Sequence, residues 1–283
     1  MNEPFIEDKM KKAILFLAVF LASQLTTYAW LGVEVPKDDK VLTNYGSSKQ
    51  DSINGEAFNV FVWNIYKAKK EGWDSQFKSV IKDYDLFLLQ EMLTTENVLN
   101  IFSHTEGVSF TGATSFMYKK DGKRTGVATG SKVEPTWQKF LRSKKREPVL
   151  STPKITLFTK YPIKNSEKEL LVVNIHAINF VSSLSLHSQL QDAADIIKKH
   201  NGPSVFAGDF NTWTLEKQLF LKKITKEVGM KEVEFKNDTR KKMFGFILDF
   251  IFVKNLQVLD SQVHNDLYSS DHKAISAQLK MIK

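Results

Sequence analysis

Residues 204–213, SVFAGDFNTW, decide the fold: a short apolar run stops at Gly208 and gives way to Asp209 and Asn211. An apolar run of this length that follows a Gly–Pro turn predicts a buried strand. The earlier segment 170–176, LLVVNIH, has the same design and ends on Asn174 and His176. Side chains two apart on a strand share a face, so the members of each pair are expected to point together.

Further apolar runs surround these two. They predict strands at 58–63, 86–89, 154–159, 248–253 and 275–281, and helical stripes at 73–84 and 186–197. Strands and helices mix without strict alternation, which predicts sheets packed face to face with helices outside them. No Pro/Gly-rich break divides the chain after residue 57, so a single domain over 57–283 is expected.

Polar residues appear where the apolar runs end. They are Asn64, Glu91, Asn174, His176, Asp209, Asn211, Asp249, Asp271 and His272. Taken singly, each has an ordinary structural explanation as a cap, a turn residue or a surface carboxylate. Together their types are chemically complementary, and strand ends on one side of a sheet are where sites are usually built.

Composition excludes several classes of protein. The chain has 283 residues, of which 42% are hydrophobic and 25% charged, which is ordinary globular composition and excludes a disordered tail or a multi-span membrane protein. It contains no cysteine. A disulfide framework, a thiolate metal site and a cysteine nucleophile are therefore excluded, and any metal must be held by oxygen and imidazole ligands.

The positive charge is local. Residues 119–160 hold twelve Lys/Arg against three acids, while the whole chain carries a net charge of +8. Such a segment fits a nucleic-acid backbone. It also fits an anionic membrane surface. The remaining interpretation is a solvated loop.

The N-terminus has the pattern of a secretory signal. Lys11 and Lys12 precede the apolar residues 13–22, and small and polar residues follow up to Ala29. This predicts a signal over 1–29, export to the periplasm or the medium, and a linker over 30–56. The alternative is a retained membrane anchor over residues 13–32.

Six motifs occur in a fixed order: Val62–Trp63–Asn64, Leu89–Gln90–Glu91, Val173–Asn174–Ile175–His176, Gly208–Asp209–Phe210–Asn211, Leu248–Asp249–Phe250 and Ser270–Asp271–His272. Over about residues 57–282 the chain resembles the endonuclease/exonuclease/phosphatase family, whose fold is that of DNase I. Finer features, including residues 207–213, are similar to its bacterial YafD-like branch. The resemblance implies an α+β fold, a four-layer α/β/β/α sandwich with the site at one rim.

Glu91 beside Asn64 suits Mg²⁺, which takes one or two protein carboxylates and keeps several waters. The resemblance implies further roles. Asp271 is expected to be a metal-linked residue, with Mn²⁺ as a substitute cation. His176, Asp209, Asn211, Asp249 and His272 are expected to act in catalysis, with Asp249 as the partner that fixes the tautomer of His272 and favours its imidazolium. Asn174 and Asn211 are expected to lie at the substrate. Whether Asp209 or His272 activates water stays open. Lys67 is a candidate phosphate contact, or else an exposed turn lysine.

These residues predict a Mg²⁺-dependent hydrolase of phosphodiester bonds, most simply a nuclease acting on DNA or RNA. The alternative is a lipid-headgroup hydrolase of the sphingomyelinase or phospholipase C type, or an inositol-phosphate phosphatase. A third hypothesis is a non-catalytic binding domain on the same scaffold. Nothing in the sequence implies a protein partner.

Overall fold

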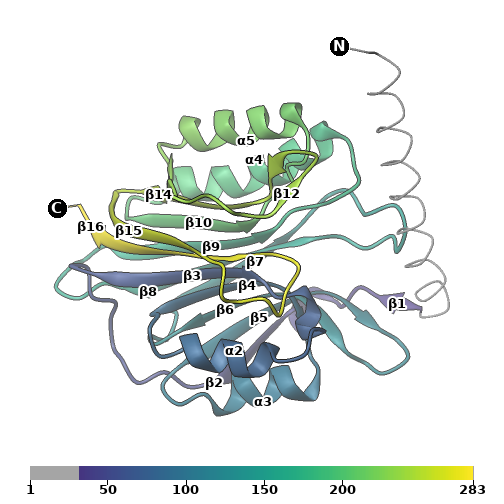
Figure 1. Ribbon diagram of the computed structural model, residues 1–283, viewed down its shortest axis with the longest axis horizontal. Helices are drawn as coiled ribbons and strands as arrows, with labels where there is room; N and C mark the ends of the chain where they lie inside the picture. The colour runs from purple at the N-terminus through teal and green to yellow at the C-terminus, as the bar shows by residue number, and fades with distance from the viewer. Residues whose placement is uncertain (1–31, 283) are drawn as a thin grey trace.

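The computed structural model describes residues 32–282, so the predicted signal or anchor lies outside the described residues. Two β-sheets lie face to face, and helices cover their outer faces (Figure 1). The first sheet has eight strands in the order β1-β5-β6-β4-β3-β16-β15, with β2 added beside β5. Its strands are β1 (Val33–Glu34), β2 (Leu42–Gly46), β3 (Phe58–Asn64), β4 (Leu86–Leu93), β5 (Ser109–Tyr118), β6 (Arg124–Ser131), β15 (Leu256–His264) and β16 (Ala274–Met281).

The second sheet has six strands in the order β11-β14-β10-β9-β8-β7. They are β7 (Trp137–Arg142), β8 (Ile155–Pro162), β9 (Glu169–His176), β10 (Ser204–Asp209), β11 (Lys231–Glu232) and β14 (Asp249–Lys254). A separate hairpin joins β12 (Lys242–Met243) to β13 (Phe246–Ile247). The helices are α2 (Trp73–Val80), α3 (Glu96–His104), α4 (Ser183–Lys199) and α5 (Leu215–Glu227), with two 3-10 turns, η1 (Asp38–Lys40) and η2 (Tyr66–Ala68).

Strand β3 shows how the sequence builds these layers. Phe58, Val60 and Val62 point into the core between the two sheets. The alternate residues Phe61 and Trp63 point to the opposite face and pack against α2 and α3. Because both faces of the strand are covered, its sequence is apolar throughout rather than alternating with polar residues.

Three apolar cores separate four layers. One core lies between the sheets, a second lies between the first sheet and helices α2 and α3, and a third lies between the second sheet and helices α4 and α5. Figure 1 shows this order from α4 and α5 at the top to α2 and α3 at the bottom. The predicted four-layer α/β/β/α sandwich is confirmed.

The predicted linker over 30–56 is wrong for its described part. β2 pairs with β5 over five residues, from Leu42↔Ala113 to Gly46↔Ser109, and Val33 pairs with Tyr118. Ile53 lies fully buried in the core between the sheets. The polar composition of this segment is that of an edge strand with one exposed side, which reads like a linker in the sequence.

None of the helices within the described range has the length and apolar character that crossing a membrane requires.

A glycine substitution tests whether β2 belongs to the fold. Gly46 has φ +66°, and an added Cβ would lie 2.7 Å from two backbone oxygens, those of Phe102 and Val108. We expect Gly46→Ala to lower the free energy of unfolding by about 2 kcal/mol or more, because strained backbone and steric overlap add. Denaturant unfolding measures it.

Gly122→Ala is the matched control, since Gly122 has φ +68° and open space around its Cβ position. An equal loss in both variants would contradict the close packing of β2, because only the backbone conformation is shared.

Candidate active site

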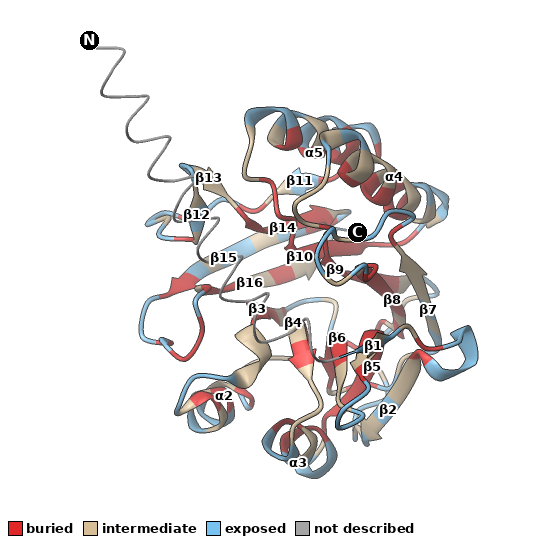
Figure 2. Ribbon diagram, turned by 90° about the vertical axis from the view of Figure 1, so that its right-hand side faces the viewer, coloured by how far each residue is buried: buried red, intermediate tan, exposed pale blue. Residues whose placement is uncertain are grey.

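The carboxyl ends of four strands meet at one edge of the sandwich, which we call the rim. β3 runs parallel to β4 in the first sheet, and β9 runs parallel to β10 in the second. Asn64 ends β3 and Asp209 ends β10, and the Asn64 Nδ2 donates to Asp209 Oδ2 at 3.0 Å. This hydrogen bond joins the two sheets at the rim, onto which Figure 2 looks.

Asp209 is the centre of the buried polar group. His176 Nε2 lies 3.7 Å and His272 Nε2 lies 3.9 Å from its Oδ2. Its Oδ1 accepts from the backbone N–H of Asn211 at 2.9 Å. The structure therefore brings together five of the residues predicted from the sequence, although they come from both sheets.

The backbone around Asp209 is unusual in two places. Gly208 has φ +138°, and an added Cβ would lie 2.0 Å from the Ile175 carbonyl oxygen, so only glycine fits between β9 and β10 here. Asn211 is left-handed with φ +49°, and its Nδ2 donates to the Ala177 carbonyl at 2.9 Å. Asparagine tolerates this conformation better than most residues. Both features fix the direction of the Asp209 carboxylate.

His272 faces a carboxylate at each ring nitrogen. Its Nδ1 is 2.8 Å from Asp249 Oδ2, and its Nε2 faces Asp209. Burial opposes a charge on this ring, but the attraction and hydrogen bond of Asp249, together with Asp209 and Asp271, outweigh it and raise the pKa of His272 to about 10. The ring is therefore an imidazolium at neutral pH, with the predicted partner Asp249 beside it.

The pKa values of His176 and Asp209 are shifted toward their uncharged forms. Burial, and then the positive charges of Lys154, His272 and Lys67, lower the pKa of His176 well below its usual value. Burial raises the pKa of Asp209 above its usual range, against the opposing charge of His272 and with support from Asp249. His176 is thus neutral at pH 7, and Asp209 is a carboxylate with raised proton affinity.

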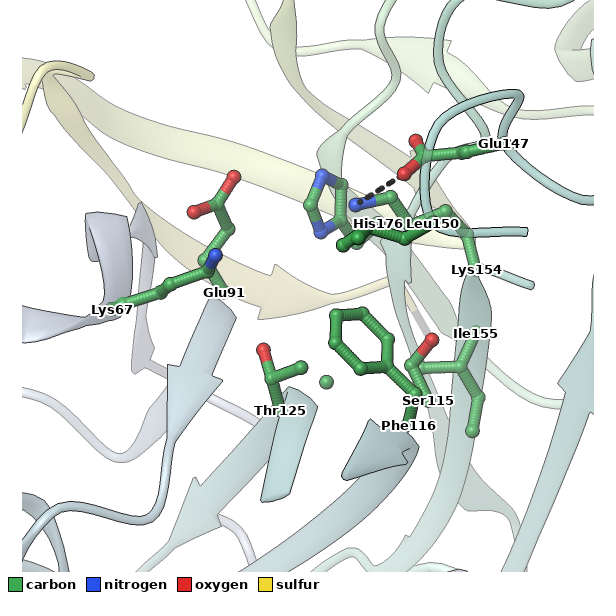
Figure 3. A pocket seen from close by; sticks show the side chains of 11 residues that line it. Lys67, Glu91, Ser115, Phe116, Thr125, Glu147, Leu150, Lys154, Ile155 and His176 are labelled. Atoms are coloured by element: carbon green, nitrogen blue, oxygen red, sulfur yellow. Dashed lines mark ion pairs between the residues drawn. The ribbon is translucent and has the colours of Figure 1, made fainter. Parts of the chain in front are cut away.

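Glu91 reaches the site through a β-bulge. The pairing of β4 with β6 shifts register between Gln90 and Met92, and Glu91 lies in the bulge with φ +56°. Bulges redirect side chains and are common beside sites. Glu91 lines a pocket that also includes Lys67, Lys154 and His176, where its carboxylate lies across from the His176 ring (Figure 3).

Glu91 and Asn64 fit a divalent cation. Among the described residues, no hydrogen bond or ion pair engages the Glu91 carboxylate, and Asn64 Oδ1 accepts only the Tyr66 N–H at 3.1 Å, which leaves it a second lone pair. A hard cation with few protein ligands suits this pair. A second group, Asp209, Asp249 and His272, also has close ligand atoms. In this group the His272 ring is bonded to Asp249 through Nδ1, and a metal ligand must be a neutral imidazole, so binding a cation there would require His272 to lose its proton.

Asn174, which is predicted to lie at the substrate, is engaged with the protein itself. Its side chain is fully buried, with Nδ2 donating to the Ala128 carbonyl at 2.9 Å and Oδ1 accepting from Gln90 Nε2 at 2.8 Å. Asn174 on β9 therefore connects the second sheet to β4 and β6 of the first.

Asp271 lies apart from the predicted metal ligands. Its carboxylate is 3.6 Å from Lys241 Nζ, and its side chain is 39% exposed. Its charge helps to raise the pKa of His272. Lys67 does lie in the pocket, where its Nζ donates to the Tyr118 hydroxyl at 3.1 Å.

Several residues without a role predicted from the sequence also hold the site in place. Ser270 Oγ donates to the Asn64 carbonyl at 2.6 Å and accepts from the His272 N–H at 3.2 Å. The buried Arg240 donates to the Asp249 carbonyl at 3.0 Å. Glu147 accepts from the Asn179 N–H at 3.0 Å. Ser270 precedes the Asp–His motif directly, and Glu147 lies in the Arg146–Glu147–Pro148 stretch that also carries the resemblance, whereas nothing local marks Arg240.

Most of the basic segment lies at the rim. The β5–β6 turn and the β7–β8 connection both open there, and they carry nine of its twelve basic residues: Lys119, Lys120, Lys123, Arg124, Arg142, Lys144, Lys145, Arg146 and Lys154. Lys132 and Lys160 lie at the opposite end, beside Asp85 and Glu169. The positive charge therefore lies mainly on one side of the candidate site.

Fold and site together define a class: a sandwich with DNase I-like topology whose rim holds carboxylate, amide and imidazole groups suited to phosphate esters. The model of the endonuclease/exonuclease/phosphatase family matches residues 61–272, and the chain belongs to that family. A UPF0294 protein of Klebsiella pneumoniae is 36% identical over 74% of this chain and 77% of its own length. A UPF0294 protein of Yersinia pestis is 37% identical over 74% of this chain and 78% of its own.

Solved structures share the fold at low sequence identity. A family member from Bacteroides thetaiotaomicron has a TM-score of 0.61 and 16% identity, covering 79% of this chain and 95% of its own. The human Nocturnin catalytic domain with bound sulfate has a TM-score of 0.60 and 15% identity, covering 81% and 96%. A mannosyl-6-phosphatase of B. thetaiotaomicron has a TM-score of 0.59 and 18% identity, covering 78% and 99%. Members of this family hydrolyse phosphoester bonds.

Removing the Asn174 side chain tests its place between the sheets. We expect Asn174→Ala to lower the free energy of unfolding by about 1–3 kcal/mol, because buried partners lose their hydrogen bonds. Thermal and denaturant unfolding measure this loss. Asn201→Ala, at an exposed position before β10, is the control. Full stability of Asn174→Ala would contradict the connecting role.

The pH dependence of stability tests the His272–Asp249 pair. Because the folded pKa of His272 is raised from 6.5 to about 10, its stabilisation is complete below pH 6.5 and is lost as the pH rises toward 10. In Asp249→Asn the hydrogen-bonded charge is absent. We expect lower stability at pH 7 and a smaller decline between pH 7 and 10 in metal-free protein.

Proton NMR of the His272 ring gives the direct reading of this pair. Its pKa is expected to fall in Asp249→Asn, since burial alone lowers it. An unchanged ring titration would contradict the ion pair.

Proposed function

We propose that this chain is a Mg²⁺-dependent hydrolase that cleaves phosphodiester bonds by direct attack of water. The observation that carries the proposal is the buried group around Asp209, in which an imidazolium and a neutral imidazole each lie within 4 Å of the carboxylate, beside the Glu91 pocket. A phosphoryl centre placed there meets a proton acceptor, a positive charge and a hydrogen-bond donor together.

Asp209 is the proposed proton acceptor. His272 carries its proton already, and Asp249 occupies its Nδ1, so the ring has no free lone pair for a water proton. Burial raises the pKa of Asp209 to about 7, so its ionised form can accept a proton near neutral pH, and Asn64 and Asn211 hold the carboxylate in direction. In this assignment the attacking water gives its proton to Asp209 as its oxygen bonds to phosphorus.

The two histidines then act as donors. The His272 imidazolium stabilises negative charge on the phosphoryl oxygens, and Asp249 keeps the ring charged and oriented. As the bond between phosphorus and the ester oxygen breaks, neutral His176 donates a hydrogen bond to the departing oxygen, which takes up the proton that Asp209 received or one from solvent. Glu91 and Asn64 would hold Mg²⁺, or Mn²⁺ in its place, which when bound polarises a phosphoryl oxygen. Lys67 and Lys154 line the same pocket and favour an anionic ester.

Two substrate classes follow from the same chemistry. Nucleic acid is supported by the basic residues at the rim, which suit a phosphate backbone. Phospholipid headgroups are supported as a substrate class by the exposed apolar side chains at the rim. The B. thetaiotaomicron neighbour, described as a mannosyl-6-phosphatase, adds a sugar phosphate as a third test compound.

Hydrolysis assays test the proposal. Purified chain is incubated with Mg²⁺, Mn²⁺ or a chelator and with bis(p-nitrophenyl) phosphate, plasmid DNA, RNA, phosphatidylglycerol vesicles and mannose 6-phosphate. We expect metal-dependent cleavage of at least one diester. Asp209→Asn and His176→Ala are expected to lose about 10²–10⁴-fold in kcat, the range of acid–base catalysis.

His104→Ala is the matched control, because His104 is exposed at the end of α3. Cleavage of no diester under any metal condition would overturn the proposed function. Equal losses in the control and the site variants would assign the activity to a contaminant.

A further inference from the structure

We infer that the rim docks on the surface of an anionic lipid bilayer, so that the site opens onto lipid headgroups. The inference rests on the proposed function for its substrate, a phosphodiester in a phospholipid headgroup, but the docking itself needs no catalysis. Three observations on the described residues carry it.

The first observation is where large apolar side chains are exposed. Of nine such side chains among residues 32–282, five lie at the rim: Val149, Leu184, Leu215, Phe244 and Tyr268. Leu215 is 62% and Tyr268 is 72% exposed. Leu184 and Leu215 occupy the first turns of α4 and α5, directly after the strands that deliver His176 and Asp209. Exposed apolar groups gathered around a site mark an interaction surface.

The second observation is that the segments carrying Leu184, Leu215, Phe244 and Tyr268 contact one another, and we call this row of segments the strip. Ser183 beside Leu184 donates to Glu216 beside Leu215, which joins the two helix starts. The Trp213 and Phe244 rings lie 6.0 Å apart, which joins α5 to the β12–β13 hairpin. Lys241 Nζ then donates to the Asp271 carbonyl at 3.0 Å, which joins the hairpin to the loop of Tyr268. Figure 2 shows these helix starts and the hairpin along one side of the rim.

Basic residues border this strip. The β7–β8 connection, residues 142–154, carries five basic residues against Glu147, and Val149 projects from the same loop. The N–H of Asn179, four residues before α4, donates to Glu147 of this loop at 3.0 Å, which places the loop beside the start of α4. Apolar side chains at the level of the headgroups, surrounded by Lys and Arg, are the pattern of a surface that binds anionic membranes.

The third observation is where the chain enters the described fold. The Lys119 N–H donates to the Gly32 carbonyl at 2.9 Å, so Gly32 lies beside the β5–β6 turn at the rim. The preceding sequence holds Lys11 and Lys12 and the apolar residues 13–22, the stretch with the pattern of a signal or an anchor. If that segment is retained in a bilayer, it tethers the domain by its rim, with the site toward the lipid.

A bilayer explains the strip better than a nucleic acid does. Phe244 and Tyr268 offer rings, but the other three of the five exposed side chains, Leu184, Leu215 and Val149, are aliphatic and stack no base, whereas nucleic-acid sites combine basic residues with aromatic platforms. Exposed aliphatic groups gain most from an apolar phase.

The absence of cysteine permits a direct test in the full chain. Leu215→Cys and Tyr268→Cys place an environment-sensitive nitrobenzoxadiazole label on the rim. Leu259→Cys, which replaces an exposed leucine on β15 away from the rim, is the matched control. Each labelled protein is mixed with vesicles of phosphatidylcholine alone or with phosphatidylglycerol, and with a single-stranded oligonucleotide.

On phosphatidylglycerol vesicles we expect about a twofold or greater rise in emission from both rim labels, quenched by spin-labelled lipid, as apolar side chains enter the headgroup boundary. The control label stays unchanged, and phosphatidylcholine alone gives a smaller rise. Rim labels that behave like the control on vesicle-bound protein, failure to bind the vesicles, or a response to the oligonucleotide instead would each overturn the inference. Insertion without hydrolysis of any ester would overturn the proposed function and leave the docking intact.

Discussion

The structure depends on the close approach of two sheets at the ends of their strands. An apolar core fills most of the space between them, but at the rim it is replaced by the hydrogen bond from Asn64 to Asp209 and by the contacts of Asn174 with β4 and β6. Buried polar groups are costly unless paired, so these contacts fix the register of one sheet against the other. The same constraint brings residues that are 145 positions apart in sequence into one site.

Charge is divided within that site. The imidazolium of His272 lies between Asp249 and Asp209 and offsets the charge of one of these two buried carboxylates. Glu91, redirected by its bulge, lies at the pocket with no described protein partner. A group that already contains a positive charge favours a further cation less than a carboxylate without a positive partner does. We therefore separate a cation position at Glu91 and Asn64 from a proton-handling group around Asp209.

Much of this could be predicted from the sequence, for physical reasons. Strands β3, β4, β9, β10 and β14 are nearly pure apolar runs because both their faces are covered, and such runs are easily recognised. β2 was missed because an edge strand with one exposed face keeps polar residues. The pairing of Asp249 with His272 followed from the resemblance. The connecting role of Asn174 did not, because a buried amide that joins two sheets and one that binds a substrate look alike in sequence. The Arg146–Glu147–Pro148 stretch is part of the resemblance but carries no role from the sequence, and Arg240 gave no local signal, since only the folded chain brings these residues to the rim.

The most direct test of the account is an anomalous-scattering map of a crystal of this chain soaked in Mn²⁺. We expect one strong anomalous peak within coordination distance of the Glu91 carboxylate and Asn64 Oδ1, with the contact between His272 and Asp249 kept intact. A peak enclosed by Asp209, Asp249 and His272 instead, with the His272 ring turned to bind it, would contradict the division of charge on which the account rests.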